Sequence, residues 1–135
     1  MTDGQADAAA TVRNVVRALA RLALPADAQI ELLDKAHLPS DELALDYEWS
    51  ISTLWRAREA GLIDRQIEAE LRRIDRDLDS ISGPERDGLW ADDALRTHPV
   101  WEQVRKRAHD LLGTIRSATG FSPPSEDAFR DGKFD

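Results

Sequence analysis

Apolar residues recur every three or four positions along most of the chain, which is the spacing that places side chains on one face of an α-helix. No segment shows the alternation of apolar and polar residues, bounded by turns, that is typical of a half-buried strand. The pattern predicts an all-α protein, a single compact bundle of five to six helices. We place this helical domain at residues 1–120 and expect residues 121–135 to form a mobile acidic tail.

The first helix is predicted over residues 7–23, where apolar residues form one stripe. This stripe consists of Val12, Val15, Val16, Leu19 and Leu22. Arginine side chains occupy the opposite face, which we expect to be solvated, at Arg13, Arg17 and Arg21.

Two prolines separate a short second helix from its neighbours. Pro25 suits the first turn of that helix, which ends before Pro39. A longer third helix is predicted from Ser40, as its N-cap, to Gly61, as its C-cap. Because apolar residues cover a wide arc of this third helix, we expect it to be the central element of the bundle.

Three further helices complete the predicted bundle. Asp64 is the expected N-cap of the fourth helix, whose apolar stripe is the most regular in the chain. Ser82 and Glu85 have the spacing of a capping box and predict a short fifth helix. The sixth helix begins near His98 and ends at Gly120.

Charge and composition restrict the classes of function. The 135 residues include 26 acidic and 18 basic side chains, a net charge of −8, which disfavours binding to nucleic acid and favours a basic partner. The chain has no cysteine, so cysteine nucleophiles and disulfides are excluded. No leader pattern and no long apolar run is present, and we therefore expect a cytoplasmic protein without a membrane partner.

The acidic charge is concentrated between residues 27 and 48, where seven carboxylates stand against Lys35 and contribute −6 of the net −8. Helix N-termini favour nearby carboxylates, which accounts for three of the seven. These three are Asp27, Asp41 and Glu42. Three others that this effect does not explain are Asp34, Asp46 and Glu48.

Aromatic side chains adjoin these carboxylates at residues 46–49. Tyrosine and tryptophan are favoured anchors of protein interfaces, and an acidic field speeds encounter with a basic partner. Tyr47 also lies on the predicted core stripe, with Trp49 at its flank, so a purely structural role is the alternative. The predicted partner-binding residues are Asp34, Asp41, Glu42, Asp46, Tyr47, Glu48 and Trp49.

Our leading hypothesis is therefore a non-enzymatic helical interaction domain, of the inhibitor or immunity type, that masks a basic toxin or nuclease. Reversing the charges of Asp46 and Glu48 is then expected to weaken capture of the partner while helicity is kept. The possibility that ranks third is a self-associating domain whose apolar surface includes Trp49, Trp55 and Trp101.

The alternative that ranks second is a metal-binding protein or small hydrolase, which would use carboxylates near Asp34 and His37, residues that can share one helix face. Glu31 and Asp34 fit one acidic motif of all-α pyrophosphohydrolases, but the second motif is missing. Catalytic signatures such as Gly-x-Ser-x-Gly, a glycine-rich phosphate loop or His-Glu-x-x-His are absent, so we expect no enzyme activity, bound cofactor or metal.

Arginines of the predicted fourth helix lie behind a turn, as they would in a helix-turn-helix reader of DNA. Carboxylates interleave with these arginines at helical spacing, for example Glu68 with Arg72. We therefore expect local salt bridges rather than contacts with nucleic acid.

Overall fold

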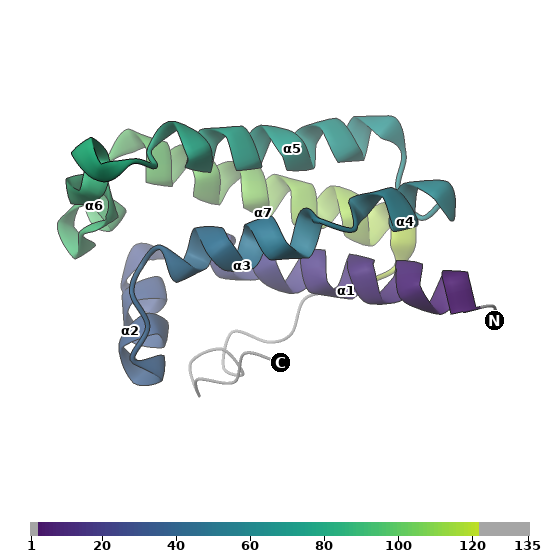
Figure 1. Ribbon diagram of the computed structural model, residues 1–135, viewed down its shortest axis with the longest axis horizontal. Helices are drawn as coiled ribbons and strands as arrows, with labels where there is room; N and C mark the ends of the chain where they lie inside the picture. Colours follow the sequence, from purple (N-terminus) through teal and green to yellow (C-terminus); the bar gives the residue numbers. More distant parts are fainter. Residues whose placement is uncertain (1–2, 122–135) are drawn as a thin grey trace.

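The computed structural model describes residues 3–121, and this part of the chain is helical without a β-strand (Figure 1). Over these residues the chain forms seven α-helices and one 3-10 helix, α1 (Asp3–Ala23), α2 (Ala26–Ala36), α3 (Glu42–Ile51), α4 (Leu54–Glu59), α5 (Arg65–Ser80), η1 (Pro84–Trp90), α6 (Asp92–Thr97) and α7 (Pro99–Thr119). The all-α prediction is confirmed. The predicted count of five to six helices is wrong, because two of the predicted helices are each broken in two.

Four sides of a bundle are formed by α1, by α3 with its continuation α4, by α5 and by α7 (Figure 1). Helix α1 packs against α3, α4 and α7, and α5 packs against the same three helices from the other side. At one end of the bundle, α2 contacts α6, which also contacts η1 and α7. None of the helices in residues 3–121 is both long and apolar enough to span a membrane.

The apolar stripes of α1 and α5 are buried, as their helical spacing predicts. Asp64 caps α5 by accepting the backbone N–H of Ile67 at 2.8 Å. His98 caps α7, since its Nδ1 accepts the N–H of Val100 at 3.1 Å, and Gly120 ends α7 with a φ of 80°. These predicted helix ends are confirmed.

The single long third helix of the prediction is wrong, because the chain leaves the helical path between α3 and α4. The Ser52 hydroxyl and backbone N–H both donate to the Trp49 carbonyl, at 2.6 and 3.2 Å, and Thr53 has φ −111° and ψ 22°. Hydroxyl residues that bond to nearby carbonyls compete with the helical ladder. The Thr53 hydroxyl is also 2.9 Å from that of Thr11 on α1, which holds the break against α1.

The two predicted ends of that long helix have different outcomes. Ser40 is not its cap, because α3 begins at Glu42 and the Ser40 hydroxyl donates instead to the backbone carbonyl of Trp90. Gly61 has a φ of 77° after the end of α4, which agrees with the C-cap predicted there.

The predicted fifth helix is two elements, η1 and α6, separated by the extended residue Ala91 with φ −72° and ψ 156°. The capping box is also wrong. The Ser82 hydroxyl donates to the Leu78 carbonyl of α5 at 3.0 Å, and Gly83, with a φ of 123°, precedes η1.

The first helix differs from its prediction in two respects. Helix α1 begins at Asp3, earlier than predicted. Arg21, expected on a solvated face, is only 3 % exposed and pairs with Asp46 of α3 at 2.7 Å. The sequence pattern of α1 identifies its core stripe but not the neighbours that cover its C-terminal end.

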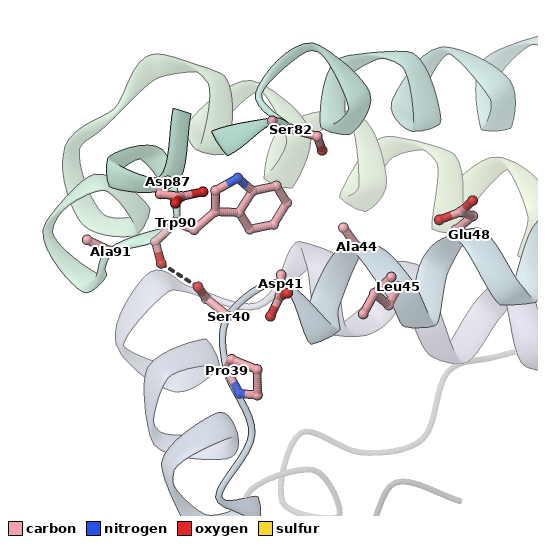
Figure 2. A pocket seen from close by; sticks show the side chains of 11 residues that line it. Pro39, Ser40, Asp41, Ala44, Leu45, Glu48, Ser82, Asp87, Trp90 and Ala91 are labelled. Carbon is pink, nitrogen blue, oxygen red and sulfur yellow. Dashed lines mark hydrogen bonds between the residues drawn. The ribbon is translucent and has the colours of Figure 1, made fainter. Parts of the chain in front are cut away.

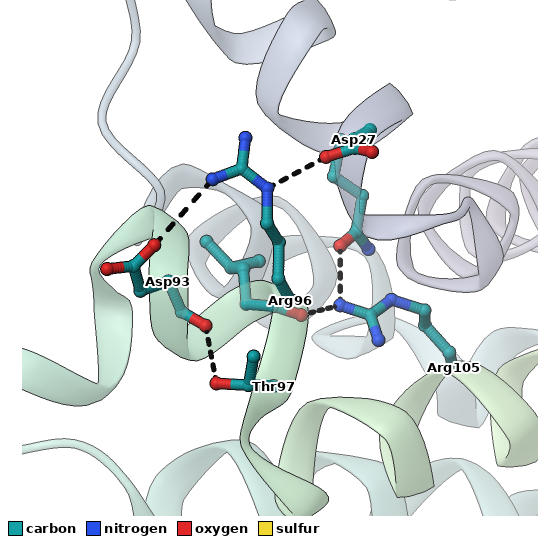
Figure 3. Close-up of polar contacts among 7 residues, drawn as sticks. Asp27, Asp93, Arg96, Thr97 and Arg105 are labelled. Carbon is teal, nitrogen blue, oxygen red and sulfur yellow. Dashed lines mark hydrogen bonds and ion pairs between the residues drawn. The ribbon is translucent and has the colours of Figure 1, made fainter.

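Polar contacts hold α2 across the end of the bundle (Figure 3). Buried Gln29 donates to two carbonyls at the end of α1, at 3.0 and 3.1 Å, and its Oε1 lies 3.4 Å from Arg105 of α7. Burial lowers the pKa of Arg105. On the surface, the Arg96 side chain of α6 donates to the Asp27 carboxylate of α2 at 2.8 Å.

The predicted division into a domain at 1–120 and a tail at 121–135 concerns residues of which the structure describes only 3–121, so most of the tail lies outside the described residues.

Tyr47 gives the first testable prediction. Its side chain is fully buried, and its hydroxyl donates to the Leu71 carbonyl of α5 at 2.6 Å. Tyr47→Phe removes this bond and is expected to lower the free energy of unfolding by about 0.5–1.5 kcal/mol. Tyr47→Ala also opens a cavity and is expected to cost about 3–5 kcal/mol. Urea denaturation measures both effects.

The control is Trp49→Phe, a change at an exposed aromatic of the same helix, which should stay within about 0.5 kcal/mol of wild type. Equal stability of the Tyr47→Phe variant and wild type would contradict the importance of this bond.

Candidate functional site

A cleft of about 550 Å³ lies between α3 and η1, beside the end of α5 (Figure 2). We call it the α3–η1 cleft, and its lining residues are Pro39, Ser40, Asp41, Ala44, Leu45, Glu48, Ser82, Gly83, Asp87, Trp90 and Ala91. The hydrogen bond from the Ser40 hydroxyl to the Trp90 carbonyl joins the two walls at one end (Figure 2).

Helical spacing explains the α3 wall. Asp41, Leu45 and Glu48 follow one another at intervals of four and three residues, so they lie on one face of α3. Leu45 is 52 % exposed, although it is a large apolar side chain. The α3 wall of the cleft therefore exposes an apolar side chain that lies between two carboxylates.

Trp90 supplies the opposite wall, and its position is fixed on two sides. Its indole Nε1 donates to the Ile81 carbonyl at 2.9 Å, and its ring meets Trp101 edge to face, with ring centroids 5.1 Å apart. Trp101 is itself fully buried and bonded through Nε1 to the Leu89 carbonyl at 2.7 Å. The η1 wall is therefore anchored to the core.

Charge in the α3–η1 cleft has one sign. Among its described lining residues, the charged side chains are Asp41, Glu48 and Asp87, and all three are exposed carboxylates. Glu48 of the cleft also acts on α5, where the pKa of Asp75 is raised. Burial is the largest cause of this shift, and the charges of Glu48 and Asp79 add to it.

Arg72 and Arg76 of α5 oppose the rise in the pKa of Asp75 but do not cancel it. Asp75 contributes in turn to a raised pKa of Tyr47, for which burial is the main cause. Burial and the neighbouring carboxylates Glu48 and Asp79 thus make an ionised Asp75 unfavourable on the side of α5 that faces α3.

The structure separates the residues predicted to form one acidic and aromatic surface. Successive residues of an α-helix point about 100° apart, so residues 46–49 face four directions. Asp46 pairs with Arg21, Tyr47 is in the core, Glu48 lines the cleft, and Trp49 is 64 % exposed in a hollow against α1.

The remaining predicted residues are also divided between surfaces. Asp41 lines the α3–η1 cleft, whereas Asp34 is exposed on α2. Glu42 lines a smaller cavity of about 260 Å³ together with Arg21 and Asp46. Of the seven predicted partner-binding residues, the cleft therefore brings together Asp41 and Glu48.

Sequence reasoning did not identify the other side of the cleft. Asp87 and Trp90 lie some forty residues beyond α3 in the chain, and no periodicity links the two segments. Leu45 did carry a signal, because it is an apolar residue off the core stripe of its helix.

Ion pairs neutralise part of the acidic segment at residues 27–48. Its paired carboxylates are Asp27 with Arg96 at 2.8 Å, Glu31 with Lys35 at 3.6 Å and Asp46 with Arg21 at 2.7 Å. Within residues 3–121, the carboxylates of this segment outside such pairs are Asp34, Asp41, Glu42 and Glu48. Fewer carboxylates of this segment are therefore available to a partner than the sequence count indicates.

Asp34 and His37, the residues of the metal-binding alternative, are both exposed at the end of α2. His37 has a φ of 55°, and its N–H donates to the Asp34 carbonyl, which ends the helix. No group of three or more His, Asp or Glu residues in the described part of the chain is placed to hold a metal ion. The metal-binding and hydrolase alternative stays a prediction.

One arginine of α5, Arg72, takes part in a local pair. Glu68 lies 3.7 Å from Arg72 and 3.2 Å from Arg58 of α4. The predicted pairing of Glu68 with Arg72 is confirmed.

No family model, curated protein or solved structure matches the chain. A proposal about function therefore depends on the geometry and charge of the chain itself.

Asp46 is expected to act in stability rather than in binding. Arg21 is nearly fully buried and Asp46 about a quarter exposed, so Asp46→Asn removes a carboxylate charge that lies 2.7 Å from a buried guanidinium. We expect the free energy of unfolding to fall by about 1–3 kcal/mol in urea denaturation. Asp41→Asn, at an exposed position of the same segment, should change it by less than about 0.5 kcal/mol.

Reversing the charge of Asp46 is therefore not a clean test of partner binding, because Asp46→Lys would place a second cation beside the buried Arg21 guanidinium. If Asp46→Asn and Asp41→Asn were equally stable, the Arg21–Asp46 pair would have no structural importance.

Asp75 gives a pH-dependent prediction. Its pKa is raised in the folded state, so the stability linked to its proton is present below the unfolded pKa and is lost as the pH rises through the folded pKa. Asp75→Asn removes the ionised group and is expected to increase the free energy of unfolding at pH 7 by about 0.2–1 kcal/mol. This gain should vanish near pH 3, where Asp75 is protonated in both states of the wild type.

Denaturation at both pH values measures the effect, and Asp34→Asn on α2 is the matched control. A loss of stability for Asp75→Asn at pH 7 would contradict the unfavourable charge cluster.

Proposed function

We propose that this protein is a non-enzymatic interaction domain whose α3–η1 cleft binds a basic segment of a partner protein. One observation carries the proposal: the apolar side chains of Leu45 and Trp90 lie in a cleft whose charged lining residues, among those described, are all carboxylates. A segment that alternates basic and apolar side chains complements both features, because interfaces combine an apolar centre with a polar rim.

An inhibitor or immunity-type role agrees with this chemistry. Toxins that act on nucleic acid carry cationic surfaces, since lysine and arginine that neutralise phosphates supply much of their affinity. Carboxylates such as Asp41, Glu48 and Asp87 compete with phosphates for the same cations. Occupation of such a surface by the α3–η1 cleft would mask it.

The rigidity of the cleft supports binding without rearrangement. Trp90 is fixed by Ile81 and Trp101, and α3 is fixed by the buried Tyr47. Preformed walls reduce the entropy that binding costs. The exposed carboxylates act mainly on the rate of encounter and on specificity, so binding should weaken as salt increases.

The test uses a fluorescently labelled nonapeptide of alternating arginine and leucine, with a glutamate–leucine peptide as the probe of opposite charge. Asp41→Lys with Glu48→Lys alters the cleft, and Asp34→Lys with Asp110→Lys makes the same charge change at exposed positions outside it. By fluorescence anisotropy at low salt, the cleft variant should bind the basic peptide at least about tenfold more weakly, a loss of about 1.4 kcal/mol. The control variant should stay within about twofold of wild type.

Equal losses in both variants would mean that net charge attracts the peptide, and absence of binding by wild type would overturn the proposal. A native partner can then be sought by capture from host extract with the same three proteins. The proposal expects a basic protein that wild type and control retain and that the cleft variant loses.

A further inference from the structure

A second surface, separate from the α3–η1 cleft, carries two exposed tryptophans. Trp49 is 64 % exposed and Trp55 is 47 % exposed. Trp49 lines a hollow of about 160 Å³ and Trp55 lines one of about 300 Å³, and both hollows are also lined by Asp7 of α1 and by Arg56. The two tryptophans therefore belong to one surface, which we call the tryptophan surface.

The break between α3 and α4 brings these side chains together. In an unbroken helix, residues six positions apart point in directions about 120° apart. The departure from helical geometry at Ser52 and Thr53 instead leaves both tryptophans beside α1, where the hydroxyls of Thr53 and Thr11 lie 2.9 Å apart.

Both signs of charge occur on the tryptophan surface. The Arg56 guanidinium lies over the Trp55 ring, 5.3 Å from its centroid, as a cation–π contact. Asp7 and Glu59 line the same hollow. This mixture contrasts with the α3–η1 cleft, whose described charged residues are all acidic.

The hollows are small for a ligand site. Small-molecule pockets usually measure about 300–1,000 Å³, and one hollow is well below this range while the other is at its lower limit. Shallow hollows beside exposed tryptophans are suited to side chains of a protein, for which tryptophan and arginine are favoured anchors.

We propose that the tryptophan surface binds a second copy of this chain through a two-fold axis. In such an interface each surface faces an identical one, so Arg56 of each copy can lie against Asp7 and Glu59 of the other. A strongly basic partner would face Arg56, and a strongly acidic partner would face the two carboxylates, so an identical surface is the best complement.

The net charge also favours the tryptophan surface over the acidic surfaces for self-association. Each copy carries −8, and contact through acidic surfaces would oppose like charges. The tryptophan surface combines opposite charges with apolar area, so two copies can approach there.

The interface is expected to be weak. A fully buried tryptophan contributes about 150–250 Å², so the exposed parts of Trp49 and Trp55 offer on the order of 200 Å² per copy. A standard stable interface buries about 800 Å² per partner. We therefore expect a reversible dimer with a dissociation constant on the order of 10–1,000 μM.

Sedimentation velocity over a concentration series tests the proposal by charge exchange. Wild type should shift from monomer to dimer as its concentration rises through that range. Arg56→Glu alone, and Asp7→Arg with Glu59→Arg, should each shift the transition to at least tenfold higher concentration. An equimolar mixture of the two variants should restore the dimer, because opposite charges then face one another across the interface.

Arg73→Glu, at an exposed position of α5, is the matched control and should dimerise as wild type does. Circular dichroism confirms that each variant is folded. A wild-type protein that stays monomeric throughout, or a mixture that fails to restore a dimer lost by both variants, would overturn the proposal. The outcome is independent of the α3–η1 cleft, since none of these substitutions lies among its lining residues.

Discussion

The burial of Tyr47 between α3 and α5 fixes the rotation of α3 about its own axis. Its ring is fully buried and its hydroxyl is bonded to the Leu71 carbonyl, so α3 cannot turn without exposing a large side chain and breaking a buried hydrogen bond. The directions of its neighbours follow from this one position. Asp46 is turned toward Arg21, and Glu48 lines the α3–η1 cleft. The same constraint thus determines which carboxylates stabilise the fold and which face solvent.

Much of the fold was predictable because single residues determine where helices begin and end. Asp64 and His98 cap their helices with side-chain acceptors, and Gly120 supplies the left-handed conformation at the end of α7. The breaks at Ser52 and Ala91 were not predictable in this way. Their sequences retain an apolar stripe, and the break at Ser52 is held by a tertiary contact with α1.

The candidate site was predictable only in its acidic character. Helical periodicity indicates which face of α3 is apolar, but it does not show what covers the other faces. Arg21 and Asp46 were therefore assigned to solvent and to a partner, although they meet each other. Asp87 and Trp90 became part of the site only through the packing of η1 beside α3, which is long-range information.

The hydrogen bond between Ser40 and Trp90 has a consequence for turnover of the protein in a cell. It joins walls that come from distant parts of the chain, so the cleft exists only when the bundle is folded. A partner bound there as proposed would bind the native state alone, and mass action would then reduce the unfolded population on which proteases act. Abundance of this protein would accordingly follow the supply of its partner, with unbound copies turned over faster than bound ones.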